Sequence, residues 1–304
     1  MQSTNFLNIA IGIFLYLLGG YVNNIIPRKE VQKNFFLLCL SLSLWMFCLG
    51  LRHLLPLEFR ELALNWTLIP IVFTPYLLYK IVQSVFYKNG NSSKLIQGIN
   101  IGILLYLLSF IVSNNAVKIQ NQELFSYIPT IHYHFIIGYI TIYIVYSCFL
   151  MFIAIFKFQG DLRVRAFLFF TGTLIALIFS ILCVYIFPLL GYFYASKSVL
   201  GFLPFSIIWA IAILHYDAFE IREHIIEEEL SLPFLNRISS FPILKLFKIL
   251  DPEEYCSKII SSKTNVVLKI TSVNSDLLNR ENLKSLNNNE RAEVLARIFF
   301  QRIR

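Results

Sequence analysis

The sequence predicts an all-α membrane protein: a bundle of seven transmembrane helices with its N-terminus outside the membrane and a small, mostly helical cytoplasmic tail. Three observations predict this fold class. Apolar residues make up 57% of the 304 residues and charged residues only 14%, whereas soluble domains contain about 45–50% and about 25%. Seven stretches are long and apolar enough to cross a bilayer. Lys and Arg gather in alternate connections between these stretches.

The seven stretches follow one another with short, more polar connections. A spanning helix needs roughly 20 mostly apolar residues, and the candidates are 5–26, 34–55, 62–86, 95–113, 131–156, 166–189 and 199–217. Prolines lie within or at the ends of the third, sixth and seventh stretches, at Pro70, Pro75, Pro188 and Pro204. Each proline frees a backbone carbonyl that a neighbour or water must satisfy inside a membrane. Two interpretations stay open: a cavity that opens outward, and ordinary helix kinks.

The distribution of positive charge predicts the orientation. The connections after the first, third and fifth stretches are rich in it, with Arg28, Lys29, Lys33, Lys88, Lys94, Lys157, Arg163 and Arg165. The connections on the opposite side hold only Arg52, Arg60, Lys118 and Lys197. Because Lys and Arg accumulate on the cytoplasmic side, we expect a transmembrane domain over 1–217 and a cytoplasmic tail over 218–304.

The net charge of +8 indicates no nucleic-acid partner. Residues 1–217 hold 13 Lys and Arg against 6 Asp and Glu, whereas 218–304 hold 13 against 12. The basic excess therefore belongs to the membrane part, where loop charges set orientation. The five cysteines form no CxxC pair or metal-ligand spacing, so we expect them to pack as small apolar residues. No cofactor and no metal site is predicted.

The tail is predicted to be a small helical subdomain. Residues 218–230 continue the seventh helix, and 287–304 form an amphipathic helix. Residues 240–252 predict a short helix with Pro242 in its first turn, which either lies in the membrane interface or packs within the tail. Residues 265–272, NVVLKITS, alternate well enough for one strand. A single strand cannot form a sheet, so this segment either pairs with a partner chain or is helical.

The end of the seventh stretch carries a resemblance to a known family. AIAILHYDAFEI (210–221) resembles the closing motif of the N-terminal seven-transmembrane-helix sensory region of bacterial histidine kinases. His215 stands where that family usually has a basic residue, and Asp217 departs from its pattern. NFFLLCLSLSLWMFCLGL (34–51) and WTLIPIVFTPYLLY (66–79) are similar to the family's second and third helices. The resemblance covers about 1–225.

This resemblance implies a receptor-like membrane sensory module that passes an outward-face signal through its seventh helix. It also points to the bacterial inner membrane and a multi-pass integral protein. The implied partners are membrane lipids, an unknown small-molecule or lipid ligand, and a cytoplasmic signalling partner or a homodimer. The signal-relay candidates lie at the end of the seventh stretch and just beyond it: His215, Tyr216, Asp217, Phe219, Glu220 and Ile221.

Polar and aromatic residues near the outer ends of the stretches are the ligand-pocket candidates. Ionisable groups at membrane depth are costly and therefore suggest function. The candidates are Arg52, His53, Asn65, Trp66, His132, His134, Tyr139 and Tyr143. A spacing of two does not place His132 and His134 on one helix face, which argues against a metal site. For the tyrosines, hydroxyl bonds across packed helices are the alternative.

We expect no enzymatic activity. Only 87 residues follow Asp217, fewer than a phosphoacceptor hairpin and an ATP-binding domain need. No kinase, cyclase or hydrolase motif is present, and no Ser-His-Asp set is readable. The alternatives are a transporter or a lipid-interacting membrane enzyme without recognisable motifs, and a truncated kinase sensor. Acidic residues are nearly absent from the apolar stretches, which disfavours a proton-coupled transporter.

Overall fold

The computed structural model describes residues 2–25, 29–87, 94–121, 125–214 and 234–279, together with 289 and 293. By their contacts the residues form two compact units. The first comprises Met1–Lys157 and Arg165–Ile213, and the second comprises Phe158–Val164 and Leu214–Arg304. The short connection 158–164 therefore groups with the tail, although it lies between two apolar helices in the sequence.

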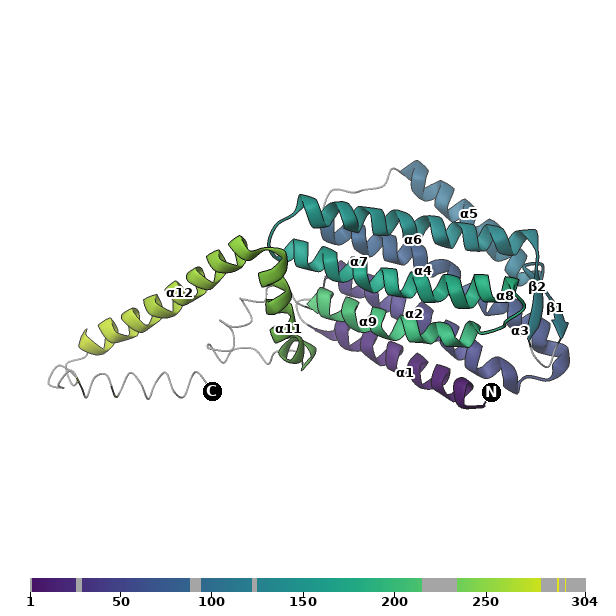
Figure 1. Ribbon diagram of the computed structural model, residues 1–304, viewed down its shortest axis with the longest axis horizontal. Helices are drawn as coiled ribbons and strands as arrows, with labels where there is room; N and C mark the ends of the chain where they lie inside the picture. Colours follow the sequence, from purple (N-terminus) through teal and green to yellow (C-terminus); the bar gives the residue numbers. More distant parts are fainter. Residues whose placement is uncertain are drawn as a thin grey trace. The chain divides into compact units, whose positions relative to one another are not determined.

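The first unit is a bundle of apolar helices lying alongside one another (Figure 1). The main helices are α1 (Gln2–Asn24), α2 (Glu30–Leu51), α4 (Leu68–Phe86), α5 (Lys94–Val112), α6 (Ile131–Lys157), α7 (Asp161–Ser180) and α9 (Val199–Leu214). The shorter ones are η1 (Arg52–Leu54), η2 (Leu57–Phe59), α3 (Arg60–Trp66), the π-helical turn η3 (Ile181–Ile186), α8 (Phe187–Leu189) and η4 (Ala195–Ser198). In the core, α2 packs between α1 and α4, and α4 packs against α6.

The lengths and composition of these helices define a helical membrane bundle. In the described part of the chain, five helical stretches are long and apolar enough to cross a bilayer: Asn5–Asn24, Glu30–Leu54, Leu57–Phe86, Ile131–Lys157 and Asp161–Leu189. Gly98–Val112 and Val199–Leu214 are shorter apolar helices. Large apolar side chains stay exposed on the bundle surface, such as Leu17, Leu105 and Ile142. In a bilayer these faces meet lipid rather than water.

Close contact between α1 and α2 requires glycine. A Cβ atom at Gly19 would lie 2.7 Å from the Cβ of Cys39, and one at Gly50 would lie 2.7 Å from Ile9. Small residues let membrane helices approach at this distance. The hydroxyl of Ser43 then donates across the interface to the Gly12 carbonyl at 2.7 Å, so a polar bond reinforces the packing.

A β-hairpin that the sequence analysis does not predict lies at one end of the bundle, here called the hairpin end (Figure 1). Strands β1 (Val117–Asn121) and β2 (Ser126–Pro129) pair antiparallel, with Val117 opposite Pro129. The buried amide of Asn65 holds the hairpin, because its side chain accepts from the Val117 N–H at 3.0 Å and donates to the Val117 carbonyl at 3.1 Å. One side chain thus replaces a missing strand at the start of β1.

Beyond the connection 158–160 and the turn at Asp251, the described residues of the second unit are helical. It contains α11 (Phe234–Leu250) and α12 (Pro252–Asn279). The strand reading of 265–272 is wrong, because these residues lie inside α12, where each backbone group can bond within its own helix. Pro242 lies inside α11 and not in its first turn, since the helix begins eight residues earlier. The predicted helices over 218–230 and 287–304 lie outside the described residues, apart from 289 and 293.

Candidate functional site

An apolar cavity of about 80 Å³ lies among α2, α4, α6, α7, η3 and α9. Its walls are leucine, isoleucine and aromatic side chains with a few hydroxyls. Two of these hydroxyls are already bonded to their own helices: Thr74 donates to Ile71 and Thr173 to Phe169, at 2.8 and 2.7 Å. Thr141 and Ser180 contribute further hydroxyls, but most of the wall is apolar. A cavity lined mainly by apolar side chains accepts apolar groups. The cavity can therefore hold a small apolar moiety inside the bundle.

Two of the prolines shape this cavity through the carbonyls they free. Pro75 has no N–H to donate to Ile71, and the Thr74 hydroxyl bonds to that carbonyl instead. Pro188 likewise cannot bond to Val184, whose carbonyl accepts from the hydroxyl of Tyr133 at 2.7 Å. Next to Pro188 the chain forms η3, a π-helical turn of the type found often at functional sites. The freed carbonyls are thus satisfied by side chains and not left open.

A second, smaller cavity of about 30 Å³ lies at the hairpin end, here called the Arg52 pocket. Its polar wall consists of Arg52, Thr67, Tyr127 and Tyr133, and its apolar wall includes Trp45. Only 9% of the Arg52 surface is exposed. The hydroxyls of Tyr127 and Tyr133 lie 3.2 Å apart. Burial raises the pKa of Tyr127, against smaller opposing effects of the Tyr133 hydrogen bond and the Arg52 charge, so its hydroxyl stays protonated at neutral pH.

The pocket candidates on the connection between α2 and α4 have different surroundings. Arg52 lines the Arg52 pocket, and its guanidinium carbon lies 4.6 Å from the ring centre of Phe125. His53 packs edge-on against the same ring, also at 4.6 Å. Asn65 is fully buried, and its side-chain amide is hydrogen-bonded to the backbone of the hairpin at Val117. Trp66 is 45% exposed and lines neither cavity. The structure therefore brings Arg52 and His53 together, and leaves Asn65 and Trp66 apart from them.

The four pocket candidates on α6 contact three different residues on other helices. His132 stacks on Phe110 of α5, with ring centres 3.7 Å apart, whereas the Nδ1 of His134 lies 3.1 Å from the Tyr185 hydroxyl. The hydroxyls of Tyr139 and Tyr143 both donate to Oδ1 of the buried Asn100 on α5, at 3.2 and 2.7 Å. These tyrosines make the cross-helix bonds that the sequence left as the alternative, and none of the four side chains lines either cavity.

The signal-relay candidates His215, Tyr216, Asp217, Phe219, Glu220 and Ile221 lie outside the described residues. The described part of the chain contains no group of three or more His, Cys, Asp or Glu side chains that could hold a metal ion. Its cysteines are all free thiols.

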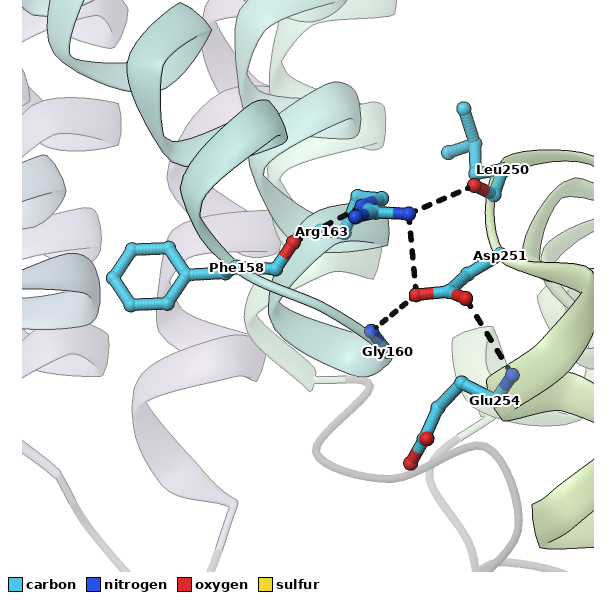
Figure 2. Close-up of polar contacts among 6 residues, drawn as sticks. All are labelled: Phe158, Gly160, Arg163, Leu250, Asp251 and Glu254. Carbon is cyan, nitrogen blue, oxygen red and sulfur yellow. Dashed lines mark hydrogen bonds and ion pairs between the residues drawn. The ribbon is translucent and has the colours of Figure 1, made fainter.

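A compact polar junction forms in the second unit around the carboxylate of Asp251 (Figure 2). The Gly160 N–H donates to Oδ2 at 2.8 Å, and the Arg163 guanidinium lies 3.3 Å from the same oxygen. The other oxygen accepts from the Glu254 N–H at 3.5 Å, so Asp251 caps the start of α12. Arg163 also donates to the Leu250 carbonyl at 3.2 Å. We call these residues the Asp251 junction; they join the connection before α7 to the turn between α11 and α12.

Sequence reasoning missed the partners that complete these sites. Tyr127 and Tyr133 were not pocket candidates, although Pro188 signals a carbonyl, four residues earlier, that needs a donor. The Asp251 junction joins residues about 90 positions apart, with a contact between Gly160 and Asp251 that no local pattern marks. The sequence Asp251-Pro252 is typical of a helix start, so the capping role of Asp251 could have been predicted. Its bond to Gly160 could not.

The apolar helices and their lipid-facing surfaces define an integral, multi-pass membrane protein. A comparison with protein families narrows this class: the family model described as the N-terminal 7TM region of histidine kinase matches residues 7–222. The chain belongs to this family, which confirms the predicted resemblance. A match of this kind implies a membrane module for sensing and signalling. Comparisons with curated proteins and with solved structures find no match.

Proposed function

We propose that the protein is a receptor-like module that senses a signal at the outer face of the membrane and passes it to a cytoplasmic partner. Residues 1–217 form the sensory domain, which crosses the membrane seven times with the N-terminus outside. Residues 218–304 form the cytoplasmic tail, which binds a signalling partner or a second copy of the chain. In this arrangement the hairpin end faces outward, and the Asp251 junction lies on the cytoplasmic side of a bacterial inner membrane.

The continuity of α7 carries this proposal. The helix begins at Asp161, next to the Asp251 junction, and Thr173, Ala176, Leu177 and Ser180 in its second half line the apolar cavity. Its 20 residues span about 30 Å at 1.5 Å per residue, which is the thickness of the hydrocarbon core. A ligand that shifts the cavity end of a stiff helix also moves Arg163 relative to its partner carboxylate. This route adds to the proposed relay through His215–Ile221.

Filling the cavity tests whether its state reaches the junction. Ala176 lines the cavity on α7 and is buried, so Ala176→Leu places three more carbon atoms there and imitates an occupied cavity. We expect hydrogen exchange of the Gly160 and Glu254 amides to change by about fivefold or more, the usual lower range of coupling between sites. The measurement uses the full chain in lipid nanodiscs, read by mass spectrometry of peptides covering 158–164 and 251–257.

Leu174→Phe is the matched control. Leu174 lies on the same helix, but its side chain is 38% exposed and does not line the cavity. This variant also adds apolar volume to α7 without filling the cavity, so junction exchange should stay at the wild-type rate. Equal exchange in the wild-type chain and in Ala176→Leu would remove the α7 route.

The relay through the seventh helix has its own test. Ile221→Pro breaks a helix at that position. We expect it to abolish signal-dependent binding of the cytoplasmic partner in a pulldown with the tail, compared with the wild-type chain. Unchanged partner binding and signalling after this substitution would remove the relay.

The orientation can be measured with a thiol reagent that does not cross membranes. Cys256 on α12 is exposed, whereas Cys39, Cys148 and Cys183 are buried. We expect Cys256 to react only after cells are permeabilised, and a cysteine introduced by Ser3→Cys in a Cys256→Ser background to react in intact cells. Labelling of both positions in intact cells would place both ends on one side and remove the receptor proposal.

A further inference from the structure

Arg52 is a buried cation that has no counterion among the described residues. Within these residues its side chain makes no hydrogen bond or ion pair, and its buried Nε has no hydrogen-bond partner. The ring of Phe125 covers one flat face of the guanidinium at 4.6 Å. A cation–π contact uses the face and leaves the N–H groups along the edge free to donate. The cavity beside this side chain is the Arg52 pocket.

An unpaired charge in such a place is costly. A buried charged group is normally paired and hydrogen-bonded, and inside a membrane protein an ionisable residue without a partner marks a functional site. The Arg60 guanidinium lies 5.2 Å from the same Phe125 ring, but it donates to the carbonyls of Leu55 and His53. The charge of Arg52 itself therefore favours an incoming negative group in the pocket.

The remaining walls of the pocket limit what this anion can be. The apolar residues that line the pocket include Leu49, Leu64, Leu68 and Val117, which suit an apolar group. The Tyr127 hydroxyl lies 3.4 Å from the Val184 carbonyl, a long bond that the hydroxyl can exchange for one to an anionic oxygen. A volume of about 30 Å³ is two to three times what one water molecule needs, so the ligand has only a few non-hydrogen atoms.

We propose that the Arg52 pocket binds a short-chain carboxylate such as formate or acetate. The guanidinium fork matches a carboxylate in geometry and charge, the Tyr127 hydroxyl donates to it, and a methyl group fits the leucine-rich wall. This inference deepens the proposed function, since it names the ligand class at the outward face. Trp45 lines both this pocket and the apolar cavity, so occupancy of the pocket acts directly on a wall of the cavity.

Thermal unfolding of the full chain in detergent micelles tests the binding itself. The probes are sodium formate, sodium acetate, sodium hexanoate and sodium chloride, with sodium gluconate keeping the sodium concentration constant. A ligand that binds only the folded state raises the unfolding midpoint, by about 2 °C at ten times its Kd for a chain of this size. We expect this rise with formate or acetate and none with hexanoate, which is too long for the pocket.

Variants at Arg52 tie the effect to the pocket. Arg52→Gln removes the cation and should abolish the response, and Arg52→Lys keeps the charge without the fork and should weaken it several-fold. Either variant suffices if the other does not fold. Arg60→Gln is the control, because Arg60 also lies over Phe125 but does not line the pocket; it should respond as the wild type does.

Three results would overturn the proposal. An equal rise with chloride would show a site for any small anion, and an equal rise in Arg52→Gln would place the binding elsewhere. A response that appears only in Glu123→Gln, a position outside the described residues, would show that the chain supplies its own carboxylate. The unfolding assay contains no signalling step, so it tests the pocket separately from the proposed function. Binding without a change in hydrogen exchange at the Asp251 junction would refute the proposed function and leave the pocket assignment intact.

Discussion

Replacing Asp251 by asparagine should open the Asp251 junction without unfolding the helices around it. The carboxylate accepts three contacts with its two oxygens: the Gly160 N–H and Arg163 on one, and the Glu254 N–H on the other. An asparagine side chain has one acceptor oxygen and one donor NH₂. Whichever way the amide turns, its NH₂ faces an N–H donor on one side.

The size of the effect follows from the groups that lose their partner. A hydrogen bond to a charged group contributes about 1.5–3 kcal/mol, and asparagine caps a helix about as well as aspartate. The ion pair adds little more than about 1 kcal/mol, because the Arg163 side chain is 23% exposed and water screens the pair. A loss of about 2 kcal/mol is expected for the junction, which corresponds to about a 30-fold larger open fraction.

Hydrogen exchange of the full chain in nanodiscs measures this open fraction. Peptides covering 158–164 and 251–257 should exchange about 30 times faster in Asp251→Asn, while peptides from α2 and α4 should not change. Glu253→Gln is the matched control, because it removes one negative charge from the same first turn of α12 at an exposed position. If Asp251→Asn leaves the Gly160 amide as protected as in the wild type, or if Glu253→Gln exposes it equally, the Asp251 carboxylate does not hold the junction.

Three further predictions concern stability, each measured by the thermal unfolding midpoint in micelles except where exchange is named. Gly160→Ala should accelerate exchange at the Asp251 junction more than Gly191→Ala accelerates exchange in its own turn. Both glycines have positive φ, of +64° and +85°, which costs an alanine about 1 kcal/mol. Only the alanine at 160 would also bring its Cβ to 3.1 Å from an α12 side chain. Asn65→Ala leaves the N–H and carbonyl at the start of β1 unpaired and should cost about 2–4 kcal/mol, so a shift within 1 °C would contradict its role. Tyr133→Phe should cost about 1–2 kcal/mol, and clearly less in a Pro188→Ala background, because alanine restores the N–H for the freed carbonyl; equal losses in both backgrounds would refute that account.

The hairpin illustrates where local sequence patterns fail. Strands of four and five residues give little periodic signal, and the register of β1 depends on Asn65, which lies 52 positions earlier in the chain. A buried asparagine between apolar residues is compatible with a ligand pocket or with a structural clamp. The choice depends on which backbone groups face it, and this is known only once the chain is folded.

Residues 265–272 show the same limit for secondary structure. Their β-branched residues alternate over a short window, and a short window does not separate strand from helix. The neighbouring turns decide: the segment lies in the middle of the 28 residues of α12, so its backbone bonds are made within the helix. Similarly, Pro242 marked a helix start by its usual preference, yet α11 continues through it.

Composition and periodicity alone determined that this chain is a helical membrane protein, and the motifs around 34–51, 66–79 and 210–221 placed it in its family. These features are readable because burial in lipid demands apolar residues in long runs, and a run is a local property of the chain. Only the tertiary structure decided that Arg52 is buried without a counterion among the described residues, that Tyr133 satisfies the carbonyl freed by Pro188, and that Asp251 binds Gly160. Each of these depends on groups distant in sequence meeting at hydrogen-bonding range, and such encounters are fixed by the packing of whole helices.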